Sequence, residues 1–428
     1  MYDILTGLLT RSEFHEEARK IILSGENGLA LVWFNLDNFK MFNNRFGFDT
    51  GDEVLKQISD VLSNVFSGEN NLVARFSDDN FVVLTDWLVV ELKVDTIQTF
   101  LSTLLENAVL RLRAGIYFPS DYEDIRASCD KAKIACDSIR KNHSVKSCMF
   151  HDGMKKELAL QQYILDNLDN AIKNGNIKIL YQPIMALSNM KICDTEALAR
   201  WNDPELGLIS PGEFIPTLEK YREIHKLDIY AMRNVCEDLK FRAENNIPVY
   251  PVSINLSRLD FELCDIINEI EFSVELNKIS RKMLKIEITE STNGEDLDVL
   301  NLGIEKLRTL GYEVWLDDFG AGYSSLNVLK DYNFDVIKFD MKFLHNFDIA
   351  KSEKAKYIIT SNLSMARLMG MQALAEGVET FEQLVYLKSI GFDKAQGYYF
   401  GKPMELEKIF GGPTWTRTKN HPVMSRGL

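Results

Sequence analysis

Eight short apolar runs recur over the second half of the chain, and most of them are separated by a segment long enough for a helix. In order they are IKILYQP, TEALARW, YPVSINLS, LKIEITES, YEVWLDDFG, DVIKFD, MQALAEG and DKAQG. The runs are almost continuously apolar, as expected for strands that are covered on both faces. This alternation of strand and helix predicts a (β/α)8 barrel, the TIM-barrel plan, better than any other α/β arrangement.

The first part of the chain has a different pattern. Its strand candidates fall at 28–37, 71–76, 81–86 and 111–118, and helical spacing appears over 51–66 and about 120–141. This mixture predicts one compact α/β domain at residues 1–152. A helical pattern over 157–175 opens the barrel domain, which we place at 153–408. Residues 409–428 show no periodicity, and we expect them to be disordered or an artefact of the reading frame.

Polar side chains stand at the carboxyl ends of the predicted barrel strands. They are Glu196, Asn255, Glu287, Glu290, Asp317, Asp318, Lys338, Glu376, Glu379 and Gln396. In a barrel of this plan the strand ends converge on one mouth, so these groups should lie close together. Five or more carboxylates cannot all stay ionised in such a place without cations. The pattern therefore predicts a metal site at the barrel mouth.

The kind of metal follows from the ligand atoms. None of the six histidines lies in these motifs, and an all-oxygen cluster favours Mg2+ or Mn2+ over zinc or copper. Asp317 and Asp318 are adjacent, and successive strand residues point opposite ways, so both can bind metal only where the strand breaks into a loop. Two such cations hydrolyse a phosphodiester by in-line attack. Lys338 would supply positive charge near the attacking hydroxide or a phosphate oxygen.

Each of these residues also has a simpler interpretation when it is taken alone. Any one of the acids could be a solvated strand end or a helix cap, and Asp317 with Asp318 could be a loop pair that binds nothing. Acids at so many strand ends together favour the metal site. Glu290 stays open between a metal ligand and a brace for the lid loop FGAGYSSL.

Seven motifs of the barrel half resemble those of the EAL family of cyclic di-GMP phosphodiesterases. In order over about 158–404 they are TEALARW, SINLS, EITES, LDDFGAGYSSL, IKFD, AEGVET and QGYYFGKP. The resemblance implies an EAL domain that opens cyclic di-GMP to linear pGpG with two Mg2+ or Mn2+ ions per active site. No metal position is substituted, which favours an active hydrolase of bacterial second-messenger signalling. The alternative is a catalytically silent cyclic di-GMP receptor or scaffold.

The same resemblance implies a role for single residues. The ligands of the first metal would be Glu196, Asn255, Glu287 and Asp317. Asp318 would reach the second metal, and we assign Glu379, a further acid of the AEGVET motif, to the metals as well. The catalytic residues would be Glu196 together with Lys338 and Glu376, of which the last two hold the nucleophilic water. The substrate would be lined by Gln182, Leu198, Arg200 and Gln396, and Glu290 would anchor the lid loop.

Three segments of the first 150 residues resemble the GGDEF domain of diguanylate cyclases, namely DILTGLLTRSEF, LDNFKMFNNRFGFDTGDEVL and RFSDDNFVVL. The signature loop departs from the family, because it reads Ser77, Asp78, Asp79, Asn80 and Phe81. Side chains therefore stand at both glycine positions, where a nucleotide needs close backbone approach. Asp78 also adds negative charge where a triphosphate would lie.

Other positions of this domain point the same way. Asn35 replaces the first aspartate of the strand motif, although Asp37 follows it, and the family's inhibitory R-x-x-D site would fall on Gly68 and Asn71. Asn43 and Asp52 still match nucleotide-contacting positions. We therefore expect a degenerate GGDEF-like domain that does not make cyclic di-GMP and serves as a regulatory or dimerisation module. A packing or dimerisation role is favoured, and GTP is kept as the partner of the weaker, sensing alternative.

The charge balance limits the remaining partners. The chain has 49 Lys and Arg against 63 Asp and Glu, a formal net charge of −14, which argues against a nucleic-acid polymer or an anionic membrane surface. No apolar run approaches about 18 residues, and the first residues lack a basic region before an apolar core, so we expect neither a transmembrane helix nor a secretory signal. These features predict a cytoplasmic protein. Barrels of this family often pair, so the resemblance also implies that a homodimer can form.

Overall fold

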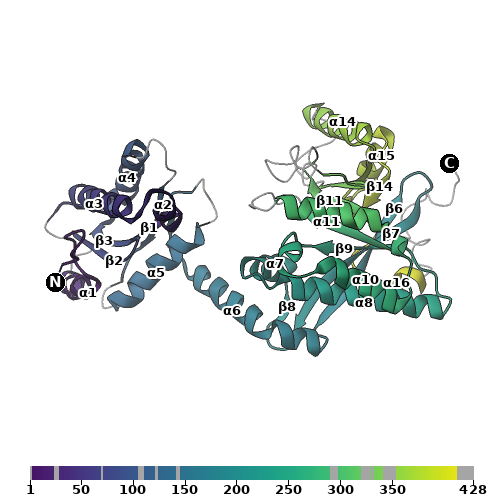
Figure 1. Ribbon diagram of the computed structural model, residues 1–428, viewed down its shortest axis with the longest axis horizontal. Helices are drawn as coiled ribbons and strands as arrows, with labels where there is room; N and C mark the ends of the chain where they lie inside the picture. The colour runs from purple at the N-terminus through teal and green to yellow at the C-terminus, as the bar shows by residue number, and fades with distance from the viewer. Residues whose placement is uncertain are drawn as a thin grey trace. The chain divides into compact units, whose positions relative to one another are not determined.

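The computed structural model describes residues 2–23, 28–68, 71–104, 110–120, 124–140, 145–289, 297–319, 329, 332–340 and 353–411. Internal contacts divide the chain into two compact units, Met1–Leu160 and Gln161–Leu428. In Figure 1 the first unit is coloured purple to blue and the second teal to yellow, and each is described by itself. None of the described helices is long and apolar enough to span a bilayer.

The N-terminal unit is built on a five-stranded sheet in the order β2-β3-β1-β4-β5. Its strands are β1 (Leu29–Asp37), β2 (Leu72–Ser77), β3 (Asn80–Asp86), β4 (Arg111–Tyr117) and β5 (Ser147–Met149). All four strands predicted in this part of the chain are present, whereas β5 was not predicted. A strand of three residues is too short to show the alternation by which strands are recognised in a sequence.

Helices cover both faces of this sheet. They are α1 (Arg11–Leu23), α2 (Phe39–Phe46), α3 (Phe48–Val65), the 3-10 helix η1 (Trp87–Val89), α4 (Val90–Leu104) and α5 (Ile125–Ser138). Val32 and Phe34 of β1 pack with α2, α3 and α4, whereas Leu31 and Trp33 pack with α1 and α5. Successive strand residues therefore pack into two separate cores, one on each face of the sheet. The unit is a three-layer α/β/α sandwich.

Helix α5 lies very close to the sheet at Gly115 of β4. A Cβ atom at this position would come within 2.0 Å of the Ala132 carbonyl oxygen and 2.2 Å of the Cys136 nitrogen. Only glycine allows the backbones of strand and helix to approach this closely. The contact fixes α5 against β4 and, with it, the position of the first turn of α5.

The second unit begins inside helix α6 (Asp152–Lys173) and contains a closed ring of strands. They are β6 (Ile177–Ala186), β7 (Lys191–Asp203), β8 (Gly207–Ile209), β9 (Val252–Leu256), β10 (Leu284–Thr289), β11 (Glu313–Phe319), β12 (Val336–Phe339), β13 (Gln372–Ala375) and β14 (Lys394–Gln396). The order is β6-β14-β13-β12-β11-β10-β9-β7-β8, and β6 also pairs with β7. Eight strands thus close a barrel, with β8 outside the ring. The predicted barrel is confirmed, and every predicted apolar run overlaps one of its strands.

One strand of the ring runs against its neighbours. β6 is antiparallel to both β7 and β14, whereas the other neighbours in the ring are parallel. The link from β6 to β7 consists of residues 187–190, and a parallel crossover needs about a dozen residues or more. The all-parallel TIM plan therefore does not hold for β6, although the ring closes as predicted.

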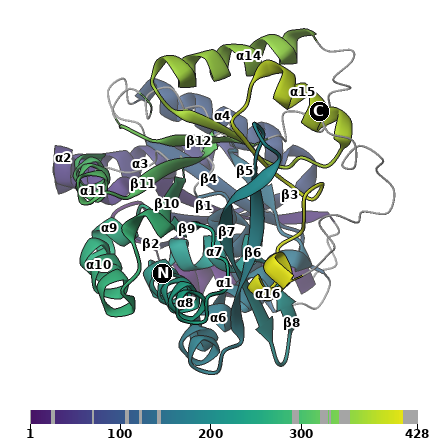
Figure 2. The same cartoon turned by 90° about the vertical axis from the view of Figure 1, so that its right-hand side faces the viewer.

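Helices lie around the outside of the ring, as Figures 1 and 2 show for α8, α10, α11, α14 and α15. The helices are α7 (Pro211–Lys220), α8 (Ile224–Glu244), α9 (Asp260–Leu263), α10 (Ile266–Asn277), the 3-10 helix η2 (Arg281–Met283), α11 (Leu297–Leu310), α14 (Glu353–Leu368), α15 (Phe381–Ile390) and α16 (Leu406–Gly411). Their apolar faces and the outward strand residues form the main core. Helices α7 and α15 begin at complete capping boxes, which satisfy N–H groups of the first turn.

The domain limits drawn from the sequence remain predictions. The contact-based division falls inside α6, between residues 160 and 161, whereas the predicted limit lies at 152. Helix α16 runs to Gly411, beyond the predicted end of the barrel at 408. Residues 412–428, which make up most of the predicted tail, lie outside the described part of the chain.

Candidate active site at the barrel mouth

A buried lysine stands at the centre of the barrel mouth. Lys338 lies in β12 between buried apolar neighbours, and its side chain is 1% exposed. Its Nζ atom lies 2.7 Å from Glu287, 2.8 Å from Glu376, 3.2 Å from Asp317 and 3.4 Å from Glu196. The four carboxylates come from β10, the segment after β13, β11 and β7. The structure thus brings together five of the side chains that the sequence placed at one mouth.

The alternation of strand residues sets the depth of this cluster. Glu287 pairs in register with Asn255, and Glu196 with Ser253, so each acid lies opposite a polar residue of the neighbouring strand β9. The residues two positions before Asp317, Lys338 and Glu376 belong with Ile184 to a small buried apolar cluster and are Trp315, Val336 and Leu374. Residues two apart in a strand point to the same face. The apolar cluster therefore fills the ring beneath the acids and keeps water out from below.

Burial and the single cation together set the ionisation of the cluster. Burial alone lowers the pKa of Lys338, but the surrounding carboxylates outweigh it and hold that pKa well above its usual value. Burial raises the pKa of Glu287 well above its usual value and that of Glu376 to about 8, even though Lys338 opposes both shifts. For Glu196 the effect of burial is outweighed by Lys338 and by hydrogen bonds, and its pKa lies below the usual value. One lysine therefore does not neutralise four carboxylates.

The oxygen atoms at the mouth fit divalent cations. One oxygen each of Glu196, Glu287 and Asp317 lies within 4.8 Å of the others, and the same holds for Asp317, Asp318 and Glu376. Oε1 of Glu287 is buried and has no hydrogen-bond partner among the described residues. A buried acceptor costs stability unless something binds it. The donors are all oxygens, which suits Mg2+ or Mn2+, and Asp317 belongs to both groups.

The backbone changes direction at the two adjacent aspartates. Asp318 has a φ of 55°, and the pairing of β11 with β12 shifts register between Leu316 and Phe319. The N–H of Asp318 donates to Oδ1 of Asp317 at 2.8 Å. In a regular strand the two carboxylates would point to opposite faces. Here the irregularity lets both contribute an oxygen to the same group with Glu376.

Amide side chains surround Glu196. Nδ2 of Asn255 donates to Oε1 of Glu196 at 3.1 Å, and Nε2 of Gln396 donates to Oε2 of Glu196 and to Oε1 of Gln182. Gln182 in turn donates to the carbonyl oxygen of Gly401 at 2.9 Å. Gln182 lies in the middle of β6 and reaches the mouth because the antiparallel pairing sets it opposite Glu196. These predicted residues therefore form one hydrogen-bonded network.

Leu198 and Arg200 follow Glu196 along the same face of β7, because the three residues are spaced by two. Both side chains are half-buried. Nη1 of Arg200 donates to the Ala199 carbonyl at 2.8 Å. Burial lowers the pKa of Arg200 while Glu196 opposes the shift, and a guanidinium stays charged in a protein at any physiological pH. The guanidinium of Arg200 is therefore a positive charge on the same face of β7 as Glu196, four residues further along the strand.

The segments that carry Glu376 and Gln396 are held together by the main chain. The N–H of Val378 donates to the Gln396 oxygen at 3.0 Å, and that of Tyr399 donates to the Val378 oxygen at 2.9 Å. A Cβ atom on Gly397 would come within 2.1 Å of the Val378 oxygen and 2.2 Å of its nitrogen. The absence of a side chain at Gly397 therefore allows the approach that sets Glu376 beside Gln396.

Two predicted acids are not part of this cluster as described. Glu379 is exposed, and its N–H donates to Oε1 of Gln383 at 2.7 Å in the segment that begins α15. Its carboxylate belongs to neither of the acid groups found among the described residues, so its assignment to a metal stays a prediction without geometric support. Glu290 and residues 320–326 of the predicted lid loop lie outside the described residues.

A buried acid pair behind β9 was missed in the sequence. Asp228 of α8 and Asp260 of α9 are 9% and 0% exposed, and Oδ2 of Asp228 accepts the N–H of Ser257 at 3.1 Å. Burial raises the pKa of Asp228 well above its usual value and that of Asp260 to about 7, so the pair holds a shared proton. Ser257 follows Asn255 by two residues, so the pair anchors the turn beside it. The available signal was an aspartate among the apolar positions of the α8 pattern.

Comparison with known proteins covers both units. Residues 165–403 match the EAL domain family, and residues 1–144 match the family "Diguanylate cyclase, GGDEF domain". The cyclic di-GMP phosphodiesterase NbdA of Pseudomonas aeruginosa is 30% identical over 95% of this chain and 53% of its own length. The bifunctional diguanylate cyclase/cyclic di-GMP phosphodiesterase MucR of the same organism is 26% identical over 96% of this chain and 61% of its own length. The chain thus spans about half to three fifths of these relatives.

Solved structures give the same picture of the fold. The structure entitled "PaMucR Phosphodiesterase, c-di-GMP complex" is 29% identical, covers 58% of this chain and 99% of its own, and has a TM-score of 0.53. The S helix-GGDEF-EAL portion of Vibrio cholerae LapD, bound to c-di-GMP, covers 93% of this chain and 95% of its own with a TM-score of 0.58. Its identity is 19%, so it supports the fold alone.

Proposed function

The chain belongs to the EAL family and carries a GGDEF-family domain ahead of its EAL domain, and from this premise we propose that its barrel hydrolyses cyclic di-GMP to linear pGpG. The observation that carries the proposal is that Lys338 at the barrel mouth forms ion pairs with four carboxylates, those of Glu196, Glu287, Asp317 and Glu376. Metal-dependent hydrolysis requires an intact oxygen cluster of this kind, whereas binding without turnover does not require one.

Two divalent cations would be held by the carboxylates and one amide. Glu196, Asn255, Glu287 and Asp317 would hold one, and Asp318 would hold the other with Asp317 as the shared ligand. When bound, Mg2+ or Mn2+ ions would offset the negative charge of the acids and the phosphodiester and make water a better nucleophile. The unpartnered Oε1 of Glu287 supports a bound cation in this place, because an ion would satisfy it.

The chain's own groups would position the reactants. Lys338 can donate three hydrogen bonds and Glu376 can accept them, and Nζ lies 2.8 Å from the carboxylate, so one attacking water beside this pair would contact both groups. The same lysine keeps positive charge beside the phosphate as charge develops in the transition state. The apolar cluster beneath keeps bulk water out, which strengthens these electrostatic contacts.

The substrate would lie above the acids, against β7 and the two glutamines. Arg200 suits a phosphate oxygen, since its fork of N–H donors matches that group. Oε1 of Gln396 is buried without a hydrogen-bond partner among the described residues, which leaves an acceptor for a donor of the ligand. Leu198 would supply apolar contact between these polar groups, and Gln182 would fix the orientation of the Gln396 amide through their hydrogen bond at 3.1 Å.

We further propose that the GGDEF-family domain makes no cyclic di-GMP and acts as a regulatory or dimerisation module. The guanidinium of Arg113 is 2% exposed and pairs with Asp37, the remaining carboxylate of the strand motif. It also donates to Oδ1 of Asn35 and to the Cys136 carbonyl. A cation of the chain itself thus occupies the surroundings in which Asp37 would have to meet a metal ion. Asp78 of the altered turn has a φ of 31°.

A product assay on the full chain tests hydrolysis. Cyclic di-GMP is incubated with Mg2+ or Mn2+ and the products are separated by chromatography, and we expect linear pGpG. Ca2+ should support much less turnover, because its longer and looser coordination fits a two-metal site poorly. Glu196→Ala should abolish turnover, and Glu205→Gln, which changes an exposed acid in the loop after β7, should not.

The outcomes separate the candidate functions. Cyclic di-GMP binding without product in the unaltered protein would favour the receptor or scaffold. Full turnover by the Glu196→Ala protein would show that the ligand assignment is wrong. Incorporation of GTP into cyclic di-GMP would contradict the inactive GGDEF-family domain, and stimulation of hydrolysis by GTP would favour a sensing role over packing.

A further inference from the structure

A cavity of about 1030 Å3 lies in the N-terminal unit between α1 and α5. It involves none of the residues assigned to hydrolysis, and none of the residues of the altered turn between β2 and β3. Its lining includes Arg11, Ser12, His15 and Arg19 from α1, and Asp124 and Arg126 at the start of α5. Pockets for small ligands occupy roughly 300–1,000 Å3. The space is therefore large enough for a nucleotide.

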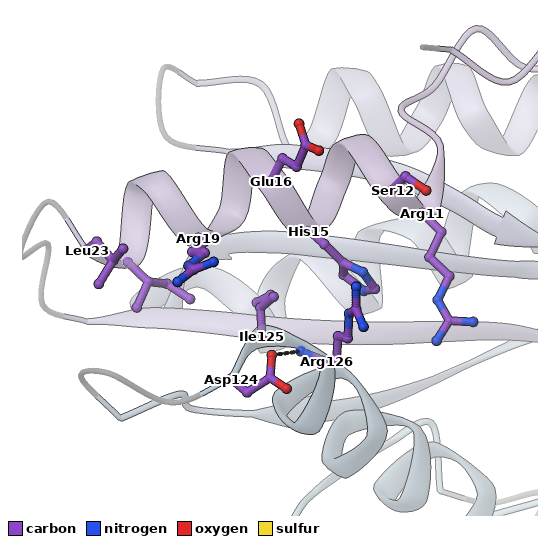
Figure 3. A pocket seen from close by; sticks show the side chains of 10 residues that line it. Arg11, Ser12, His15, Glu16, Arg19, Leu23, Asp124, Ile125 and Arg126 are labelled. Carbon is purple, nitrogen blue, oxygen red and sulfur yellow. Dashed lines mark hydrogen bonds between the residues drawn. The ribbon is translucent and has the colours of Figure 1, made fainter.

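Three guanidinium groups line this cavity. Figure 3 shows Arg11 and Arg126 on the same side of α1 as His15, with Glu16 directed to the other side. The second acid of the lining, Asp124, caps α5 by accepting the N–H of Arg126 at 3.2 Å. Three guanidinium groups thus face two carboxylates in the lining, and one of these, Glu16, is directed away, so positive charge exceeds negative charge in the space. Arginine binds phosphate oxygens through two parallel hydrogen bonds, which makes it the side chain best suited to phosphate groups.

An aromatic ring holds two of the lining residues in place. The guanidinium of Arg11 lies 5.6 Å from the ring centroid of Phe76, and the His15 ring lies 5.3 Å from it at 86°. Nε2 of His15 is buried and has no hydrogen-bond partner within the described residues. Burial lowers the pKa of His15, and the charges of Arg11 and Arg126 lower it further against the opposite effect of Asp124 and Asp130. The imidazole is thus neutral near pH 7 and leaves one buried nitrogen without a partner.

We propose that the cavity between α1 and α5 binds a phosphate-bearing anion. The guanidinium groups of Arg11, Arg19 and Arg126 would take its phosphate oxygens. Nε2 of His15 would gain the partner that it lacks. The N-terminus of α5, a helix of 14 residues, places the positive end of its helix dipole on the same side.

The test measures ligand binding to the full chain by calorimetry, in the absence of divalent cations. ATP, inorganic phosphate and adenosine are compared, because they separate a nucleotide, a free phosphate and a base without phosphate. We expect ATP to bind, phosphate to bind more weakly because it meets fewer of the arginines, and adenosine not to bind. Tightest binding by inorganic phosphate would support the site with free phosphate as its ligand. Equal binding of adenosine and ATP would overturn the proposal.

Variants locate the binding. Arg11→Ala with Arg126→Ala should weaken ATP binding at least about tenfold, the effect of losing hydrogen bonds to a charged group. Arg126→Ala alone provides the same test without touching the Arg11–Phe76 contact. Arg140→Ala removes an exposed arginine beyond the other end of α5 and should leave binding unchanged. Unchanged ATP affinity in both cavity variants, or no binding of ATP or phosphate by the unaltered protein at millimolar concentration, would overturn the proposal.

The imidazole of His15 gives a second measurement. A bound anion opposes the charges of Arg11 and Arg126, so ATP should raise the pKa of His15 in an NMR titration. The His225→Gln protein, altered in helix α8 of the barrel unit, should show the same shift. A His15 pKa that does not respond to saturating ATP would contradict binding in this cavity, even if ATP binds elsewhere on the chain.

Discussion

The Nζ atom of Lys338 lies 2.7 Å from Oε2 of Glu287, and the two side chains are 1% and 0% exposed. A cation and an acid buried so deeply are costly to desolvate, and they persist only because each compensates the other. Three further carboxylates contact the same lysine. The lysine thus holds together more acids than it can neutralise, and burial raises the pKa of two of them, Glu287 and Glu376.

Removal of this lysine should make the barrel dependent on divalent cations for its stability. We expect Lys338→Met to lower the free energy of unfolding by about 3–5 kcal/mol in EDTA, because the buried acids lose their partner. Mg2+ should then stabilise the variant more than the unaltered protein, since ions that bind only the native state shift the equilibrium toward it. Urea unfolding with EDTA or Mg2+ measures both effects. Lys306→Met, which changes an exposed lysine of α11, is the control. Equal stabilisation by Mg2+ in both proteins would contradict the prediction.

The acid pair behind β9 should make the barrel less stable as the pH rises. In the native state burial raises the pKa of Asp260 to about 7, whereas the unfolded chain releases this proton near pH 4. The native state therefore holds more protons between these values, and the free energy of unfolding falls as the pH rises from about 4 to about 7. Asp260→Asn removes the titrating group. Over this pH range its free energy of unfolding should therefore fall by a few kcal/mol less than that of the unaltered protein. Urea unfolding of both proteins across this range gives the slopes, with Asp298→Asn as an exposed control. Parallel slopes for all three proteins would refute the shared proton.

The pair of Arg113 and Asp37 should be essential to the N-terminal unit. Arg113→Met leaves Asp37 buried without its cation, and Oδ2 of Asp37 already lacks a hydrogen-bond partner among the described residues. We expect a loss of about 3–5 kcal/mol in the unfolding of this unit. Asp37→Asn in the same chain should recover part of that loss, because the uncompensated charge disappears. A double-mutant cycle measures the coupling, and strictly additive effects would mean that the two side chains do not stabilise each other.

Gly397 should be required for the geometry of the mouth. Gly397→Ala would place a Cβ against the backbone of Val378, and overpacking of this kind costs about 1–3 kcal/mol. The displaced segments carry Gln396 and Glu376, so hydrolysis should fall by roughly tenfold or more, as small shifts of catalytic groups do. Gly212→Ala is the matched control, because the nearest atom to its Cβ would be 3.7 Å away. Activity of Gly397→Ala equal to that of the control would contradict the prediction.

Much of the barrel could be predicted because its signals are local. Lys338 stands in an otherwise apolar run, and Asp317 with Asp318 ends another, so the polar residues themselves mark strand ends. The alternation of runs and helices fixed the number of strands. The direction of β6 was not predicted, although the short link 187–190 carried the information. The antiparallel direction of β6 is what sets Gln182 opposite Glu196, so this position could not be explained from the predicted all-parallel barrel.

The missed features depend on contacts between distant segments. Asp228 and Asp260 lie 32 positions apart in helical patterns, where an aspartate is normally exposed or a cap. Arg113 alternates with Arg111 in a strand candidate, and nothing in that pattern shows that its guanidinium reaches Asp37. The cavity between α1 and α5 joins residues more than 100 positions apart. Such pairs become visible only when the fold brings the segments together.

The placement of β6 between β7 and β14 has a consequence for biosynthesis. Ala186 pairs with Lys394, so one seam of the ring joins positions 208 residues apart. Translation delivers the first barrel strand long before its last neighbour exists, and the seam must wait until almost the whole domain has left the ribosome. During that interval β6 presents an open edge on which another chain could add a strand. The barrel unit is therefore most exposed to misassembly while it is being made.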